Sequence, residues 1–390
     1  MWATVDRRGL DHADARANPQ RYPRTVSNLD SAPTEQTCAG DPSVQHGLEI
    51  LEPREVPLGG ARAMTVRRTL PQRTRSMVGA WCFLDHFGPD DVTDGPGMQV
   101  PPHPHTGLQT VTWLFAGEIE HHDSVGSDCR VRPGELNLMT SGHGISHSEH
   151  SPDDRTSTTL HGVQLWTALP HASAGVAPAF EHHEDLPVLE AAGARVQVFL
   201  GRLPAQPRLG RAEPLTSPAT TYSELLGAQV DLEAGATLVL TVDPEHEHAV
   251  LVDAGEVTVD QEPLLADQLG YAAPGRRELT LTTRSRARLV LLGGRPSTEE
   301  IVMWWNFVGR SHDEVVAARA DWQSQHVYTD RDTLDTLGAL EAPGAGAGQE
   351  PPSTGRRETE RFGTVVGYDG APLPAPVLPN VRLAPRKNRV

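Results

Sequence analysis

Between about residue 50 and residue 300, apolar residues occur in many short runs and not in a helical rhythm. These runs are rich in β-branched residues and are broken by Gly, Pro, Asp and Asn. Such a pattern is typical of short strands joined by turns, and it favours β-sandwiches or barrels over alternating strands and helices. We therefore predict that this part of the chain is an all-β body.

One segment after this body has a helical pattern. Ser311 begins the sequence Ser-His-Asp-Glu, which has the form of a capping box, the usual start of a helix. Val315, Ala318 and Trp322 follow at spacings that place them on one helical face. The pattern predicts a short C-terminal helix over 311–325.

The two ends of the chain and one internal segment lack this patterning. Residues 1–49 are polar, poor in aromatic residues and aperiodic, which predicts a disordered arm. Residues 336–360 include a Gly, Pro and Ala-rich stretch and are interpreted as a linker. Residues 361–390 combine prolines with scattered apolar residues, so we predict an extended tail that docks on the barrels.

A faint internal repeat indicates two barrels of the same type in tandem. Residues 113–119 and 250–257 each have the pattern of a strand that turns at a glycine into a second strand. A Pro-Gly turn follows each copy. A chain of 390 residues is long enough for two cores. We place the two domains at 50–185 and 186–335, the latter including the helix.

Composition excludes several classes of function. Lys and Arg total 34 against 51 Asp and Glu, a formal net charge of −17, so direct nucleic-acid binding is not expected. No apolar run is long enough to cross a membrane, and no secretory signal is recognisable, which predicts a cytoplasmic protein without membrane contact. Cys38, Cys82 and Cys129 are too scattered for a disulfide framework or a thiolate zinc site. A bound metal would therefore use nitrogen and oxygen ligands.

Seven of the eighteen histidines lie between residues 103 and 150, and two short sequences there have chelating spacing. They are His103-Pro104-His105 and His147-Ser148-Glu149. On a strand, residues i and i+2 project to the same face, so each sequence offers two ligands. If the two strands face one another across a barrel, three imidazoles and one carboxylate converge. This set of ligands suits Fe(II), Mn(II), Ni(II), Cu(II) or Zn(II). The alternative to a metal site is that these residues are histidines of surface loops.

The same region carries a family resemblance. The matching segments are Leu84 to Pro89, His103 to Leu108, Thr110 to Phe115, Gly117 to Ile119, Met139 to Ser141, Ile145, His147 to Glu149, and Gln164 to Trp166. Together they resemble the signature of the pirin family, which are two-domain members of the cupin superfamily. The resemblance resumes around Gly293-Gly294 and Asn306-Phe307-Val308, and it covers most of the chain between the two ends.

The resemblance implies a bicupin whose N-terminal barrel binds iron through His103, His105, His147 and Glu149. These are the four residues that the spacing argument selects. Fe(II) is the metal that the family favours, with Mn, Ni, Cu or Zn as the other ions that this ligand set accepts.

The resemblance also implies that the second barrel lacks a metal. His246 and His248 form another His-x-His, but no matching pair follows, and we interpret Glu245 to His248 as an exposed acidic turn. Elsewhere, His121, His122 and His150 are interpreted as solvated turn histidines.

Two functions follow from the resemblance. One is oxygen-dependent cleavage of flavonols such as quercetin, or of related enol substrates, with Glu149 as the candidate base. The other is a non-enzymatic regulator that senses redox state through its iron and binds protein partners. We favour the dioxygenase, because the acidic composition gives no sign of a role in a DNA complex.

Overall fold

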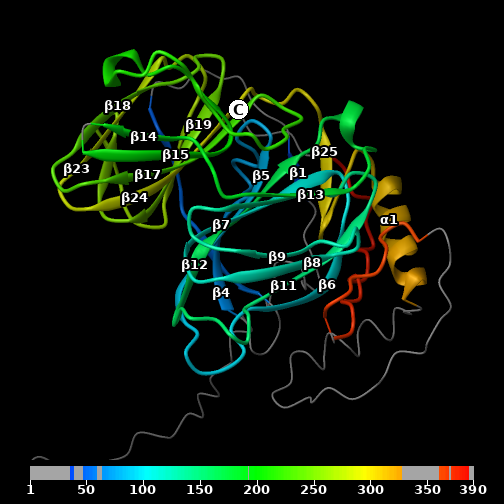
Figure 1. Ribbon diagram of the computed structural model, residues 1–390. Coiled ribbons are helices and arrows are strands. Elements are labelled where there is room, and N and C mark those ends of the chain that lie inside the picture. The colour runs from blue at the N-terminus through cyan, green and yellow to red at the C-terminus, as the bar shows by residue number, and fades with distance from the viewer. Residues whose placement is uncertain are drawn as a thin grey trace, which may run out of the picture.

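The structure, a computed structural model, describes residues 36–38, 47–58, 64–191, 193–326, 360–368 and 370–385. This part of the chain consists mainly of β-strands folded into two barrels (Figure 1), which confirms the predicted all-β, two-cupin architecture. Two short 3-10 helices, His171–Ser173 and Pro207–Leu209, lie in connections. No helix among the described residues is both long and apolar enough to span a membrane.

Two antiparallel sheets form the first barrel. The larger has the order β13-β10-β7-β12-β5-β4-β3. Its strands are β3 (Arg54–Leu58), β4 (Met64–Leu70), β5 (Trp81–Asp91), β7 (Leu108–Ala116), β10 (Leu136–Thr140), β12 (Thr159–Ala168) and β13 (Ala179–His183). The smaller has the order β6-β11-β8-β9. Its strands are β6 (Gln99–His105), β8 (Ile119–Asp123), β9 (Asp128–Val131) and β11 (Ile145–His150).

The second barrel repeats this plan. Its larger sheet has the order β14-β15-β17-β24-β19-β22-β2, with β16 paired to β15. These strands are β2 (Glu49–Leu51), β14 (Val188–Ala191), β15 (Ala194–Leu203), β16 (Leu215–Thr216), β17 (Leu225–Leu232), β19 (Glu247–Ala254), β22 (Leu269–Ala272) and β24 (Ala287–Gly294). The smaller sheet has the order β18-β23-β20-β21, with β18 (Thr237–Thr241), β20 (Val257–Val259), β21 (Glu262–Leu264) and β23 (Glu278–Thr283).

A third, three-stranded sheet lies beside the first barrel and contains β1 (Gln36–Cys38), β25 (Ile301–Trp304) and β26 (Phe307–Gly309). Strand β1 falls within the segment 1–49, which was expected to be a disordered arm. Strand β2 straddles the expected domain boundary at residue 50 and pairs with β22 of the second barrel. Strand β2 therefore belongs to the second barrel, although it precedes the first barrel in the chain.

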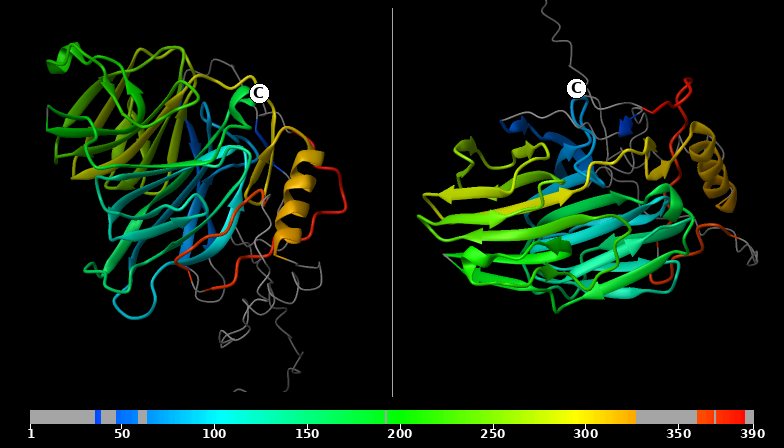
Figure 2. Two further views of the ribbon diagram at one scale, coloured as in Figure 1. Left: turned by 45° about the vertical axis from the view of Figure 1, so that its right-hand side comes forward. Right: turned by 90° about the horizontal axis from the view of Figure 1, so that it is seen from above.

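The larger sheets of the two barrels pack face to face (Figure 2) and share one apolar core. Trp81 and Trp113 of the first barrel contact Phe199 of the second, with ring centroids 6.4 and 4.9 Å apart. The indole N–H of Trp81 donates to the backbone carbonyls of Leu226 and Gly293 at 3.1 Å. These tryptophans are therefore core residues, and they join the barrels.

The segment around His246 and His248 differs from its prediction. Glu245 is exposed, but His246 is 7%, Glu247 0% and His248 1% exposed, so the interpretation of the whole segment as an exposed acidic turn is wrong. The Glu247 carboxylate accepts hydrogen bonds from the Gly79 N–H at 2.6 Å and the Tyr271 hydroxyl at 2.8 Å. Packing of one barrel on the other thus covers this strand end, which no local pattern reveals. No metal-like cluster of His, Cys, Asp or Glu in the described ranges includes His246 or His248.

A buried polar network also joins the barrels. The Asp253 carboxylate of β19 accepts hydrogen bonds from Nε2 of His86 and of His161, both at 2.7 Å. Its other oxygen pairs with Arg288 at 3.0 Å. Burial alone would raise the pKa of Asp253, but the hydrogen bonds from the two histidines outweigh it and hold the pKa well below its ordinary value. Asp253 is therefore an ionised group on which the domain contact depends.

We expect Asp253→Ala to lower the free energy of unfolding by about 3 kcal/mol, because it leaves buried donors unpaired. Chemical denaturation measures the loss, and Asp185→Ala, at an exposed position, should change it by less than about 0.5 kcal/mol. A carboxyl group whose pKa is lower in the folded than in the unfolded protein stabilises the fold at pH values above its unfolded pKa, about 3.9 for Asp. This stabilisation is lost as the pH falls below that value. The parent protein should thus lose this advantage over the variant below about pH 4, and equal stabilities at pH 7 would contradict the assignment.

Helix α1 (His312–Gln325) confirms the predicted helix at 311–325. The Ser311 hydroxyl accepts the Glu314 N–H at 3.2 Å, although the Glu314 carboxylate returns to the N–H of Arg310 and not to that of Ser311. Val315, Ala318 and Trp322 are buried as expected.

The described part of the tail, 360–368 and 370–385, runs along this helix and the first barrel (Figure 2). The Leu373 N–H donates to the Pro102 carbonyl at 2.8 Å, and the Leu373 carbonyl accepts the Trp322 indole N–H at 2.7 Å. Phe362 is fully buried, whereas Val366 is 77% exposed. Only some of the apolar tail residues therefore dock. The expected linker at 336–360 lies almost wholly outside the described residues.

Phe362→Ala should destabilise the protein by about 3–5 kcal/mol, the usual cost of removing a buried aromatic ring. The ring packs against Trp322 and Phe307, at centroid distances of 5.6 and 5.9 Å. Val366→Ala removes an exposed side chain of the same tail and should cost less than about 0.5 kcal/mol. Differential scanning calorimetry compares the two variants. Similar melting temperatures for both would mean that the tail is not docked in solution.

Candidate metal centre

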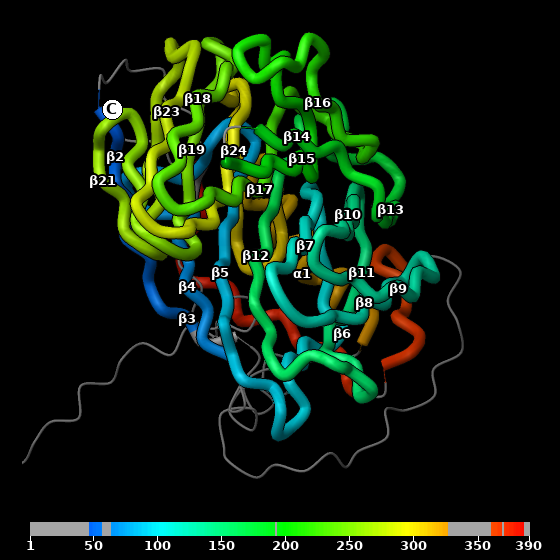
Figure 3. Tube along the Cα trace, turned by 60° about the vertical axis from the view of Figure 1, so that its left-hand side comes forward, coloured from blue at the N-terminus to red at the C-terminus, as the bar shows by residue number. Residues whose placement is uncertain are grey.

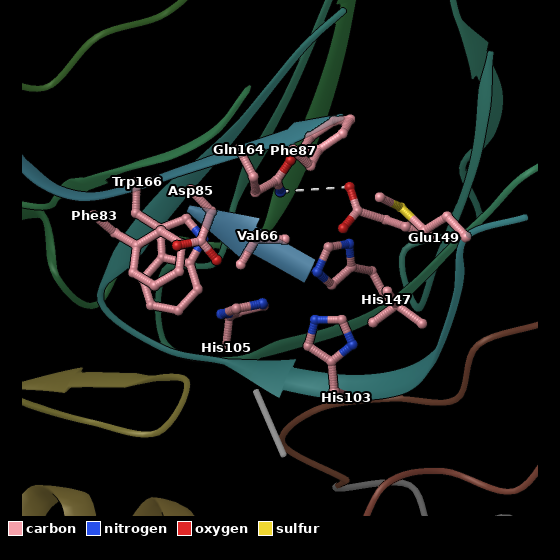
Figure 4. Close-up of a pocket in the computed structure, with 12 residues that line it drawn as sticks. Val66, Phe83, Asp85, Phe87, His103, His105, His147, Glu149, Gln164 and Trp166 are labelled. Carbon is pink, nitrogen blue, oxygen red and sulfur yellow. Dashed lines mark hydrogen bonds between the residues drawn. The ribbon is translucent and has the colours of Figure 1, made fainter. Parts of the chain in front are cut away.

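Strands β6 and β11 bring the two chelating sequences together. The strands pair antiparallel, with His147 directly opposite His103. Because alternate residues share a face, His105 and Glu149 lie on the same inner face as their partners. All four side chains project into the interior of the first barrel (Figure 4), and each is at most 7% exposed.

The three imidazole rings form a compact triangle. Ring centroids are 4.4 Å apart for His103 and His147, 4.9 Å for His103 and His105, and 5.0 Å for His105 and His147. Burial lowers the pKa of His103 to about 4 and lowers the pKa values of His105 and His147 well below their usual range. All three rings are therefore neutral at pH 7, which is the form that binds a metal.

Backbone carbonyls fix the orientation of two of the rings. Nδ1 of His103 donates to the Pro101 carbonyl at 2.9 Å, and Nδ1 of His105 donates to the Asn306 carbonyl at 3.2 Å. A neutral imidazole that carries its proton on Nδ1 has its lone pair on Nε2. Each ring thus turns a free Nε2 lone pair into the barrel.

A side-chain relay fixes the third ring. The Asp123 carboxylate accepts from Nε2 of His121 at 3.0 Å, and Nδ1 of His121 lies 3.4 Å from Nδ1 of His147. Because a carboxylate only accepts, a His121 ring with a single proton carries it on Nε2, and its Nδ1 then accepts from His147. Nε2 of His147 then holds a lone pair, and this buried atom has no hydrogen-bond partner within the described ranges. His121, 2% exposed, is therefore not the solvated turn histidine that we expected.

Glu149 lies beside this triangle, and its ligand atom lies within 4.8 Å of those of His121 and His147. Its Oε1 accepts hydrogen bonds from the Thr112 hydroxyl at 3.0 Å and from the Gln164 amide at 3.4 Å. The other oxygen points towards the ring of His147 (Figure 4). Burial raises the pKa of Glu149, against opposing effects of His121 and the two hydrogen bonds. A cation at this place would restore the carboxylate form.

A small cavity of about 40 Å³ adjoins the four residues. Apart from these four residues, its lining consists of apolar and aromatic side chains and two polar groups, Asp85 and Gln164. Phe83 and Trp166 stack at a centroid distance of 3.9 Å. Asp85, held by Arg68 through hydrogen bonds of 2.7 and 2.8 Å, points into the cavity (Figure 4). A lining of apolar and aromatic side chains with a few polar groups is typical of a small-molecule site.

Several of these residues were not identified as functional from the sequence. Asp85, Gln164 and Trp166 appeared only as members of the family resemblance. The available signal was the i, i+2 spacing of Gln164 and Trp166 on one strand, which places both on one face.

The arrangement can hold one transition-metal ion. Three neutral imidazoles and a carboxylate are nitrogen and oxygen donors of intermediate and hard character, and the cavity leaves space for further ligands. The fit rests on an observation: the Nδ1 atoms are all engaged, and the Nε2 atom of His147 is buried and unpaired. Among the described residues, His103, His105 and His147 are one of the groups whose ligand atoms lie within 4.8 Å of one another.

The fold and this site place the protein among the bicupins, with a candidate metal centre in the N-terminal barrel. Residues 63–167 match the family model described as Pirin, and residues 227–328 match the Pirin C-terminal cupin domain. The chain belongs to the pirin family.

Individual relatives span most of the chain. A Pseudomonas aeruginosa protein named "Putative quercetin 2,3-dioxygenase" is 43% identical over 77% of this chain and 89% of its own length. A "Pirin-like protein" of Caulobacter vibrioides is 38% identical over 66% of this chain and 88% of its own. A crystal structure of quercetin 2,3-dioxygenase from Acinetobacter baumannii superposes with a TM-score of 0.71 at 35% identity, covering 86% of this chain and 97% of that one.

Proposed function

We propose that this protein is an iron-dependent dioxygenase that cleaves flavonols such as quercetin, or related enols. His103, His105, His147 and Glu149 are the proposed ligands. The observation that carries the proposal is the unpaired, buried Nε2 atom of His147 beside two other oriented imidazoles and an aromatic-lined cavity. The names of the P. aeruginosa and A. baumannii proteins support the choice of substrate class.

A bound iron ion would supply the Lewis acidity that makes an enol hydroxyl acidic and the redox chemistry that dioxygen requires. The protein's own groups then bind and orient the substrate. The stacked Phe83 and Trp166 offer apolar walls that suit a planar ring, and Asp85 can accept a hydrogen bond from a phenolic hydroxyl. The apolar and aromatic side chains of the lining would limit the access of water to the reacting atoms.

Glu149 is the proposed base. Thr112 and Gln164 hold Oε1, so Oε2 is the oxygen available to take the proton of the substrate hydroxyl. The same hydrogen bonds keep the carboxylate at the edge of the cavity when it carries that proton. Glu149 would thus serve both as a ligand and in proton transfer.

Oxygen uptake tests the proposal. Metal-free protein is loaded anaerobically with Fe(II), mixed with quercetin and then exposed to air, while oxygen consumption and flavonol absorbance are followed together. We expect equal molar losses of oxygen and flavonol, and parallel loading with Mn, Ni, Cu and Zn identifies the active ion. If bound iron changes oxidation state but no flavonol or related enol promotes oxygen uptake, the dioxygenase proposal fails and the redox-sensing regulator becomes the better description.

A further inference from the structure

The outer face of the small sheet in the first barrel carries a second group of histidines and carboxylates. Along β8 and β11, side chains alternate, so Glu120, His122 and His150 project away from the barrel interior. The register places Glu120 opposite His150, and His122 opposite Asp128 of β9. Figure 3 shows these three strands side by side. Four potential ligands therefore meet on the side of the sheet that faces away from the cavity.

The distances within this group suit a metal ion. Nε2 of His150 lies 3.0 Å from Oε2 of Glu120, and Nε2 of His122 lies 3.7 Å from Oδ1 of Asp128. The rings of His122 and His150 stack at 5.1 Å. Ligand atoms of Glu120, His122 and His150 all lie within 4.8 Å of one another. Ligand atoms at about 2.0–2.2 Å from a tetrahedral ion are roughly 3.4 Å from one another. Small side-chain rotations would therefore bring these residues to coordinating distances.

Two ring nitrogens in this group are buried and unsatisfied. Nε2 of His122 has no hydrogen-bond partner in the part of the chain that the structure describes, and the side chain is only 9% exposed. Nδ1 of His150 is likewise buried without a partner. Buried polar atoms are nearly always paired, because an unpaired one loses its hydration without compensation. The unpaired Nε2 of His122 indicates a ligand that the protein chain itself does not provide.

The local charge favours a cation. The surrounding charged residues are Glu118, Glu120, Asp128 and Asp154 with Arg130 and Arg132. Four carboxylates against two guanidinium groups leave an excess of two negative charges. The Nε–H of Arg130 donates to Oε1 of Glu120 at 3.2 Å, which leaves Oε2 for another partner. A divalent ion would neutralise this excess.

We propose that this face is a second metal site, in which Glu120, His122 and His150 bind a divalent transition-metal ion and Asp128 is within reach as a fourth ligand. Two imidazoles with carboxylates form a set that Zn²⁺ accepts well. The site uses none of the residues of the cavity, so it stands independently of the proposed dioxygenase activity.

The ion would also secure the C-terminal tail. The Tyr368 ring lies against His150 at a centroid distance of 5.9 Å. Gly367, at φ +95°, approaches His122 so closely that a Cβ atom there would lie 2.4 Å from Nδ1 of the ring. A metal that fixes both rings would therefore fix the surface on which this tail segment rests. Zinc binding should raise the melting temperature, since a ligand that binds only the folded state stabilises it.

The test uses the full chain, stripped of metal by chelation, equilibrated with micromolar Zn²⁺ and freed of excess. Atomic emission spectroscopy gives the zinc content per chain. The parent should retain two zinc ions, one in the cavity and one on the outer face. His122→Gln should retain one, His147→Ala should retain one, and the double variant none. Zinc should still raise the melting temperature of His147→Ala, but not that of the double variant.

His182→Gln is the matched control, because His182 is a partly buried histidine of β13 whose ring pairs with Asn137 and lies outside the group. It should retain two zinc ions. Glu120→Gln provides a second variant if His122→Gln does not fold, and it should also retain one. The proposal is overturned if the parent retains one zinc and His147→Ala none, if His122→Gln retains two, or if the second ion binds only at millimolar zinc.

Discussion

We expect Glu149→Gln to reduce flavonol turnover per bound iron by a factor on the order of 10²–10⁴, the usual contribution of a proton-transfer group. Glutamine has nearly the same shape and keeps an oxygen donor, so the three histidines should still hold the ion. It cannot accept a proton at neutral pH. The measurement is turnover after anaerobic iron loading and exposure to air, divided by the iron content of each sample.

The matched control is Glu181→Gln, on β13 outside the barrel interior, which should leave turnover per iron unchanged. If Glu149→Gln matches the parent per bound iron, Glu149 acts only as a ligand. A variant that loses its iron completely would instead show that the carboxylate is needed for binding, and turnover per iron could then not be assigned to proton transfer.

The second large effect concerns iron binding. His147→Ala should lose one equivalent of bound iron relative to the parent, because it removes one of the three inward-facing imidazoles. The melting temperature of the metal-free protein should change little in comparison, since two packed barrels do not depend on an ion to bury their cores. Iron content after anaerobic loading and gel filtration measures the loss. Retention of the full iron content would contradict the assignment of His147 as a ligand.

Asp123→Asn probes the same ligand without touching it. An asparagine can present its amide N–H to His121, which would move the proton of that ring from Nε2 to Nδ1. Nδ1 of His147 could then no longer donate to His121, and the His147 ring would carry its proton on Nε2. A protonated Nε2 has no lone pair with which to bind a metal. Loss of such an orienting partner typically costs 10–100-fold in metal affinity. An unchanged iron affinity would show that His147 is oriented by other contacts.

Much of the site could be predicted because its information is local. The i, i+2 spacing of His103 with His105, and of His147 with Glu149, selects four residues that lie on one inner face. The helix at 311–325 was equally accessible, since its cap and buried face occupy consecutive turns.

The rest depends on register and on contacts between distant segments. The roles of His121 and Asp123 follow only when β8 is known to lie beside β11, in a register that places His147 opposite Asp123. The burial of Glu247 arises from the packing of one barrel on the other. Likewise, the pairing of β2 with the second barrel cannot be inferred from three residues near the start of the chain. Each of these features is set by tertiary structure, and a short sequence window does not contain it.

The carbonyl that orients His105 belongs to Asn306, some two hundred residues further along the chain. Strand β26 follows it at once, and Phe307 bridges to Thr106 beside that histidine. During synthesis on the ribosome, all four proposed ligands therefore emerge long before the residue that orients this histidine. The segment that returns from the second barrel completes the centre last. A fragment that ended at residue 185 would carry all four proposed ligands and still lack the group that aims one of them.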